Sequence, residues 1–185
     1  MKRILVMLLF GFIRNGYSRA GILKSIGYFH SFGENNFIAT PFLGTEPKHI
    51  SFGSNVWLAT RVSLITHDVS VHMIGNREKE YFDSVGFIKI ENNVFIGANV
   101  VVLPNVRICS NVIIGAGAIV SRSVLESGVY VGSPLKKIAS FDDYVSSVKK
   151  RSQEFPWCGY LHDRKQNKVI LRKKREQYIS TKLND

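Results

Sequence analysis

Two histidines in the middle of the chain are the side chains best suited to acid–base chemistry near neutral pH. His67 lies in the segment Leu64-Ile-Thr-His-Asp, and His72 follows it by five residues. Histidine titrates close to neutrality, so a positioned imidazole can take a proton from a hydroxyl or an amine. Asp68 could orient the ring, although neighbours in sequence often point apart. We therefore treat His67 as a candidate general base, Asp68 as its candidate catalytic partner and His72 as a candidate substrate contact.

Thiol chemistry and nucleic-acid binding have less support in the sequence. The two cysteines, Cys109 and Cys158, lack the spacing of a zinc site and are too few for a disulfide framework. We therefore expect a reducing, cytoplasmic location. The net charge of +11 favours anionic partners. Nucleic acid is not expected among them, because the sequence has no zinc-finger spacing, RNP-type aromatic motif or basic region followed by heptads.

The candidate residues are positioned by a repeat of six residues, a period that neither a helix nor a simple strand produces. Aliphatic residues recur in steps of six, and small or β-branched residues recur four positions after each of them. The first set is Ile90, Ile96, Val102, Ile108, Ile114 and Val120, and the second is Val94, Val100, Val106, Val112, Ala118 and Val124. We expect short strands joined by corners, which coil and stack at about 4.8 Å with the aliphatic side chains inside. Glycines are expected near the corners, where unusual backbone conformations cost them little.

The same register predicts an all-β domain of parallel coils over residues 30–138. It reappears in two earlier runs, which two extra residues near Pro47 separate. These runs are Phe32, Ile38 and Gly44, and then Phe52, Leu58 and Leu64. Residues 69–87 break the register and are polar and charged, so we expect a loop that leaves the coils.

The two ends of the chain do not follow the repeat. Residues 1–29 contain the apolar run Ile4 to Phe10, which is too short to span a bilayer and is not followed by an A-x-A-like cleavage site before Arg14. We interpret this run as a short helix that covers one end of the core. Within residues 139–185 we expect an amphipathic helix over 141–155, followed by a polar, basic tail. The tail could contact an anionic membrane surface, which would place the protein at the inner face of that membrane.

Three segments of the chain resemble the hexapeptide-repeat acyltransferases. They are Ile88-Lys-Ile-Glu-Asn-Asn-Val-Phe-Ile-Gly-Ala-Asn-Val-Val-Val-Leu-Pro-Asn-Val, Ile113-Ile-Gly-Ala-Gly-Ala-Ile-Val and Val131-Gly-Ser-Pro-Leu-Lys-Lys-Ile. The resemblance covers roughly residues 32–138 and is greatest to the sugar and polysaccharide O-acetyltransferases. It implies a left-handed parallel β-helix, a homotrimer, and CoA bound between neighbouring subunits. Phe95, where many relatives have Trp, and the basic tail depart from the family pattern.

The resemblance also implies a reaction and the residues that perform it. The expected reaction moves an acetyl group from acetyl-CoA to a hydroxyl or amine of a sugar-type acceptor, without a metal. In the similar enzymes the histidine at the position of His67 is the general base. The resemblance places the CoA contacts at Gly97, Ala98, Gly115, Ala116, Arg122, Pro134 and Lys136, with Arg122 and Lys136 near the phosphates and Pro134 near the adenine. Trp57, which flanks the same coil as His67, either stacks on a sugar or packs against a neighbouring subunit.

Two other functions remain open from the sequence. A zinc enzyme similar to the γ-class carbonic anhydrases would use the same scaffold, with His67, His72 and His49 as its available ligands, provided that the three converge. A non-catalytic β-solenoid that only binds a partner would make the Thr-His-Asp segment a coincidence. Metal analysis would identify the first function, and an assay for thiol release from acetyl-CoA would exclude the second.

Overall fold

The computed structural model describes residues 12–39 and 44–184. The apolar run Ile4 to Phe10, which was expected to form a helix, lies outside the described residues. The chain divides into two compact units, Met1–Phe141 and Asp142–Asp185.

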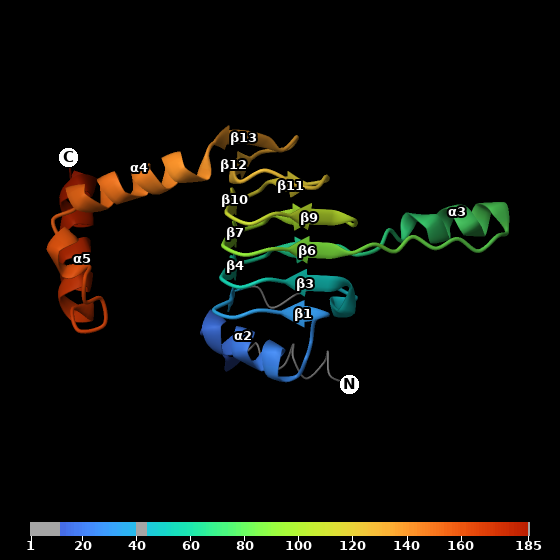
Figure 1. Cartoon of the computed structure of the whole chain (residues 1–185), viewed down its shortest axis with the longest axis horizontal. Helices are drawn as coiled ribbons and strands as arrows, with labels where there is room; N and C mark the ends of the chain where they lie inside the picture. The colour runs from blue at the N-terminus through green and yellow to red at the C-terminus, as the bar shows by residue number, and fades with distance from the viewer. Residues whose placement is uncertain (1–11, 40–43, 185) are drawn as a thin grey trace. The chain divides into compact units, whose positions relative to one another are not determined.

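The first unit is a stack of short parallel strands that fall into three sheets (Figure 1). From β3 to β11, consecutive strands along the chain pass from the first sheet to the second, the third and back to the first, as coils with three sides require. The first sheet contains β1 (Ser31–Phe32), β3 (Ile50–Phe52), β6 (Ile88–Ile90) and β9 (Val106–Ile108). The second contains β2 (Phe37–Ile38), β4 (Val56–Leu58), β7 (Val94–Ile96), β10 (Val112–Ile114), β12 (Gly128–Val131) and β13 (Lys136–Ala139). The third contains β5 (Ser63–Leu64), β8 (Val101–Val102) and β11 (Ile119–Val120). Among the strands of the described residues, β13 alone is antiparallel to its neighbour, β12, and it ends the second sheet.

The strand register confirms the six-residue repeat. In the regular coils a residue pairs with the residue eighteen positions later, as Ile88 does with Val106. Phe32 pairs instead with Phe52, which shows the two extra residues that the sequence places near Pro47. The first set of aliphatic positions, from Ile90 to Val120, is at most 1% exposed and forms the core of the stack.

Asparagine, rather than glycine, makes most of the corners in the regular coils. Asn93, Asn99, Asn105 and Asn111 each follow an inward aliphatic residue by three positions, with φ between 56° and 61°. Asparagine tolerates this left-handed region better than other residues with a side chain. Gly97 has a different role, because a Cβ there would lie 2.5 Å from the amide nitrogen of Ala116 on the next coil. Glycines lie near the corners, as expected, but the left-handed corner position itself is asparagine in these coils, apart from Gly117 with φ of 73°.

The break in the repeat is a helical arm rather than a loop. Residues 69–87 leave the stack between β5 and β6, and Ser70–Glu78 form helix α3, which projects away from the coils (Figure 1). Lys79 ends the helix in a left-handed conformation with φ of 58°. Helix α3 packs little against the rest of the chain: Gly75 is the residue that it buries, and Met73 and Ile74 are 64% and 42% exposed.

Helix α2 (Gly16–Ser25) lies at the N-terminal end of the stack (Figure 1). Asn15 caps it by accepting a hydrogen bond from the amide of Tyr17 at 2.8 Å. Ala20 and Leu23 of α2 are buried in the core of the coils. The segment 1–29 thus contains a helix beyond the apolar run in which one was expected.

The second unit is helical. It contains α4 (Phe141–Glu154), the short η2 (Cys158–Tyr160) and α5 (Lys168–Asn184). The position of α4 coincides with the amphipathic helix expected over residues 141–155, whereas the basic tail forms a second helix, α5. Among the residues that the structure describes, no helix is long and apolar enough to cross a membrane.

Candidate active site

His67 lies where the arm leaves the coils. It follows β5 at the corner between the third and the first sheet, and it forms an antiparallel bridge with Val85 on the returning part of the arm. The amide of Asp68 donates to the carbonyl oxygen of Ser84 at 3.0 Å, which closes the base of the arm. These contacts fix the backbone of His67, while its side chain remains 26% exposed and accessible to a reactant.

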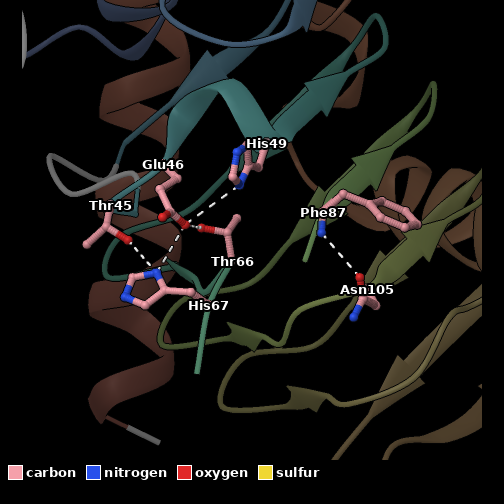
Figure 2. Close-up of polar contacts among 7 residues, drawn as sticks. All are labelled: Thr45, Glu46, His49, Thr66, His67, Phe87 and Asn105. Carbon is pink, nitrogen blue, oxygen red and sulfur yellow. Dashed lines mark hydrogen bonds and ion pairs between the residues drawn. The ribbon is translucent and has the colours of Figure 1, made fainter. Parts of the chain in front are cut away.

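The imidazole of His67 is held through one nitrogen. Its Nδ1 lies 2.9 Å from Thr45 Oγ1 and 3.1 Å from Glu46 Oε2 (Figure 2). The hydroxyl of Thr66, which is fully buried, donates to the same carboxylate oxygen at 2.9 Å. A carboxylate only accepts hydrogen bonds, so the contact with Glu46 requires the ring proton on Nδ1. The neutral ring then presents an unprotonated Nε2, which is the atom a general base needs.

Glu46 reaches His67 because the coil that carries it is longer than the others. This coil contains the two extra residues, and η1 (Pro47–His49) occupies its corner directly after Glu46. Gly44 brings the chain close to the next coil: its φ is +79°, and a Cβ there would lie 2.4 Å from the carbonyl oxygen of Leu64. Only glycine fits so close an approach in that conformation.

Asp68, predicted as the catalytic partner of His67, has a different contact. Its Oδ1 accepts a hydrogen bond from the amide of Ser70 at 2.9 Å, at the start of α3. Hydrogen bonds from the side chain and the backbone of Ser70 hold the pKa of Asp68 below its usual value, and the nearby charge of His67 adds a smaller effect in the same direction. The carboxylate that orients the imidazole is therefore Glu46 rather than Asp68, because Asp68 points to the arm.

Trp57, considered as a sugar-stacking residue, is engaged in packing within the chain. It lies on β4 in the second sheet, whereas His67 follows the third. Its indole stacks on Phe37 with ring centroids 4.9 Å apart and meets Tyr17 edge-on at 5.5 Å. Its Nε1 donates to Asn55 Oδ1 at 3.1 Å. A contact between Trp57 and a substrate has no support from this geometry.

The three histidines considered as zinc ligands do not converge. His72 is an exposed residue of α3, with its ring 6.0 Å from that of Tyr81. His49 Nδ1 lies 3.7 Å from Glu46 Oε2, the oxygen that also contacts His67 (Figure 2). Within residues 12–39 and 44–184, no group of three or more His, Cys, Asp or Glu could hold a metal ion.

The small residues predicted to contact CoA are stacked at one corner of the coils. Gly97 and Ala98 follow β7, and Gly115 and Ala116 follow its neighbour β10. The amide of Gly97 donates to the carbonyl oxygen of Ile114 at 2.8 Å, which ties the two coils together. In the described part of the chain, the amides of Ala98 and Ala116 have no acceptor, so both can donate to a ligand. This corner precedes the third sheet, whereas His67 follows it.

The basic residues predicted to contact CoA line a hollow at the C-terminal end of the stack. Arg122 and Lys136 border it together with Lys137. Lys137 is paired with Glu126, but Arg122 and Lys136 have no ion pair with any described residue. Pro134 is exposed in the turn between β12 and β13, close in sequence to Lys136. The structure thus leaves two cations available to an anionic group here.

Thr45, Glu46 and Thr66 were missed by the sequence reasoning. A usable signal was present, because the coil that precedes His67 has two extra residues in the corner beneath it. Where a regular repeat is interrupted, the backbone departs from the coil geometry, and polar residues at such a position are candidates for a functional site.

Comparisons with known proteins agree with this fold. Residues 87–122 match the family described as "Bacterial transferase hexapeptide (six repeats)". Over 159 residues the chain is 31% identical to galactoside O-acetyltransferase of Lactococcus lactis, and the alignment covers 74% of this chain and 70% of that protein. Over 105 residues it is 38% identical to Protein CapG of Staphylococcus aureus, which covers 57% of this chain and only 60% of that protein.

Solved structures share the coils. A maltose O-acetyltransferase from Clostridium difficile 630 matches with a TM-score of 0.56 at 23% identity, covering 75% of this chain and 84% of that one. A galactoside acetyltransferase in complex with coenzyme A matches with a TM-score of 0.56 at 24% identity, covering 78% and 82%. At these identities the likeness shows the fold alone, and it implies a left-handed β-helix. With the repeat, the family match and the identity to the Lactococcus protein taken together, the chain belongs to the hexapeptide-repeat acetyltransferases.

Proposed function

We propose that the protein transfers an acetyl group from acetyl-CoA to a hydroxyl of a sugar or polysaccharide-type acceptor, with His67 as the general base. The observation that carries this proposal is the imidazole held at Nδ1 by Thr45 and Glu46, which leaves Nε2 available. The galactoside O-acetyltransferase relatives support the acceptor class, and the relative bound to coenzyme A supports the donor. An amine on a sugar would react by the same steps.

The reaction requires one proton transfer in each direction and one acyl transfer. Nε2 of His67 takes the proton of the acceptor hydroxyl as that oxygen attacks the thioester carbonyl carbon. The carbon–sulfur bond then breaks, and the imidazolium returns the proton to the leaving thiolate. Glu46, 3.1 Å from Nδ1, stabilises the positive ring between these two steps. The thiolate is a good leaving group, so no covalent enzyme intermediate is needed.

The donor is proposed to follow the corner of small residues. The amides of Ala98 and Ala116 would donate to carbonyl oxygens of the pantetheine arm, and Gly97 and Gly115 allow the close approach of neighbouring coils at this corner. Arg122, Lys136 and Pro134 then lie at the end of the stack where the phosphates and the adenine would bind.

The proposed site needs a second copy of the chain. Within one chain His67 and the corner of small residues lie on opposite edges of the third sheet. The first sheet presents polar residues outward, Lys89 and Arg107 among them, whereas the second and third present apolar ones such as Phe95 and Ile119, which are 42% and 38% exposed.

Two different apolar faces, one on each neighbouring copy, can pack together in a heterologous interface that closes into a ring, and the family implies that this ring is a trimer. His67 of one copy would then face the CoA corner of the next. Sedimentation velocity at micromolar concentration should show a trimer, and a fully active monomer would contradict this assembly.

The acceptor can be identified by a screen for thiol release from acetyl-CoA. The screen compares four classes of acceptor: neutral sugars, sugar nucleotides, amino-sugar nucleotides and sialylated oligosaccharides. The arm of residues 69–87 starts next to His67, so we expect it to border the acceptor. The coils of residues 30–138 would carry the catalytic residues. Release of the CoA thiol that depends on one of these acceptors would support the proposal. The absence of both release and acetyl-CoA binding would favour a non-catalytic solenoid.

A further inference from the structure

The second unit contains a strongly basic groove that acetyl transfer does not use. It is lined by five cations, one carboxylate and one buried aliphatic residue. These residues are Arg164, Lys165, Lys168, Arg172, Arg175, Glu176 and Leu171. Cations gathered in one hollow repel one another, so the arrangement favours a bound anion.

The charges of the groove are mostly unbalanced by the described residues of the chain. Glu176 is paired with Arg172 at 2.8 Å, one helical turn away. Arg175 lies over the ring of Trp157, 5.9 Å from its centroid. Among residues 142–184, Arg164, Lys165 and Lys168 have no carboxylate partner, and all three are exposed. The groove therefore keeps free positive charge for a ligand.

The same face of α5 continues from cations to exposed aliphatic residues. Lys168, Arg172, Arg175, Ile179 and Leu183 follow one another at spacings of three or four, so they form one stripe along the helix. Ile179 is 52% exposed and Leu183 is 80% exposed. The face of the helix next to this stripe is packed: Leu171 is 3% exposed at the floor of the groove, and Tyr178 meets Trp157 edge-on at 5.4 Å.

We propose that this stripe docks the protein on an anionic lipid bilayer. The cations would lie among the headgroups, and Ile179 and Leu183 would enter the boundary of the acyl chains, as in helices that lie in a membrane interface. A second copy of the helix fits less well, because it would bring like charges together. Single-stranded nucleic acid also fits less well, because its bases stack on exposed aromatic rings, whereas Trp157 is only 7% exposed.

Vesicle co-sedimentation of the full chain tests the proposal directly and does not depend on enzyme activity. The probes are phosphatidylcholine vesicles and the same vesicles with about one third phosphatidylglycerol. Only the anionic vesicles should bind, and binding should weaken as the salt rises from about 0.1 M to 0.5 M. A cation at the surface contributes about fivefold, so the triple variant Arg164→Gln, Lys165→Gln, Lys168→Gln should lose on the order of 100-fold in affinity.

Matched variants distinguish the groove from net charge. Lys149→Gln, Lys150→Gln, Arg151→Gln removes the same charge from α4, and all three side chains are exposed outside the groove. We expect this control to lose far less affinity than the groove variant. An equal loss in both, or no binding to anionic vesicles by the wild-type protein, would overturn the proposal.

A second pair of variants distinguishes a lipid surface from a soluble polyanion. Ile179→Ser with Leu183→Ser should weaken vesicle binding by about tenfold or more. Val169→Ser with Ile170→Ser changes two exposed residues that lie off the stripe, and it should have little effect. If inorganic polyphosphate or duplex DNA binds more tightly than the vesicles, and the Ile179 and Leu183 changes leave vesicle binding intact, the lipid assignment is wrong.

Discussion

Replacing Glu46 by glutamine isolates the effect of one negative charge on the proposed base. The Oε2 atom of Glu46 accepts hydrogen bonds from Thr66 Oγ1 at 2.9 Å and from His67 Nδ1 at 3.1 Å. The carbonyl oxygen of a glutamine can accept both bonds, so the ring should keep its position and its tautomer. What Glu46→Gln removes is the stabilisation of the imidazolium that forms during the reaction.

The size of the effect follows from the exposure of the pair. A hydrogen bond to a charged group contributes about 1.5–3 kcal/mol, and solvent screening reduces this for partly exposed groups. The side chains of His67 and Glu46 are 26% and 37% exposed, so the lower part of that range applies. About 1.5–2 kcal/mol corresponds to a decrease of about 10- to 30-fold in kcat. Thiol release with a saturating acceptor measures kcat, and the same data give KM for acetyl-CoA.

A matched control separates the catalytic effect from a loss of structure. Glu91 also has a carboxylate with low exposure, 21%, bonded to Arg107 and Ser110, but it follows the first sheet. Glu91→Gln should leave kcat within about twofold, because its partners are not reacting groups. The reasoning about Glu46 is refuted if Glu46→Gln keeps wild-type kcat, or if its whole effect is a raised KM for acetyl-CoA.

Four substitutions, one of them the control Glu91→Gln, test the stack and the donor site. Gly44→Ala would place a side chain at a φ of +79° and against the next coil. We expect it to lower the free energy of unfolding by about 2 kcal/mol or more and Tm by about 4–8 °C. An unchanged Tm would contradict the close approach of Gly44 to Leu64. The side-chain hydrogen bond from Arg107 holds the pKa of Glu91 below its usual value. The ionised Glu91 therefore stabilises the folded protein fully above about pH 4.3, and this stabilisation is lost as the pH falls through the lowered pKa of the folded state. Urea unfolding between about pH 2 and 5 should therefore depend less on pH in Glu91→Gln, and an identical dependence would exclude this linkage. Arg122→Glu and Lys136→Glu should each raise KM for acetyl-CoA by about 10- to 100-fold with little change in kcat, and unchanged kinetics in both would remove the proposed phosphate site.

The coils could be predicted from the sequence because their period is written along the chain itself. Each inward position from Ile90 to Val120 recurs after six residues, and no long-range contact is needed to see it. The helix α3 could not be predicted in this way. It is nine residues long and buries only Gly75, so it is too short and too little packed to show the repeated apolar spacing of a helix in a core.

The site was predictable only in part for a related reason. His67 stands out because its residue type and its place before the break in the repeat are both visible in the sequence. Its contact with Glu46 crosses from one coil to the next over 21 positions, and the two extra residues near Pro47 shift this pair away from the eighteen-residue spacing of the regular coils. Adjacency made Asp68 the obvious candidate, but its carboxylate accepts from Ser70 at the start of the arm.

The central claim is that His67 is the general base, and the kinetics of His67→Ala with an identified acceptor test it most directly. The side chain lies at a corner outside the buried aliphatic core, so the variant should fold, and its affinity for acetyl-CoA should stay close to that of the wild type. We expect kcat of His67→Ala to fall by about 100- to 10,000-fold, the usual contribution of one acid–base group. A folded variant that keeps more than about a tenth of the wild-type rate would contradict it.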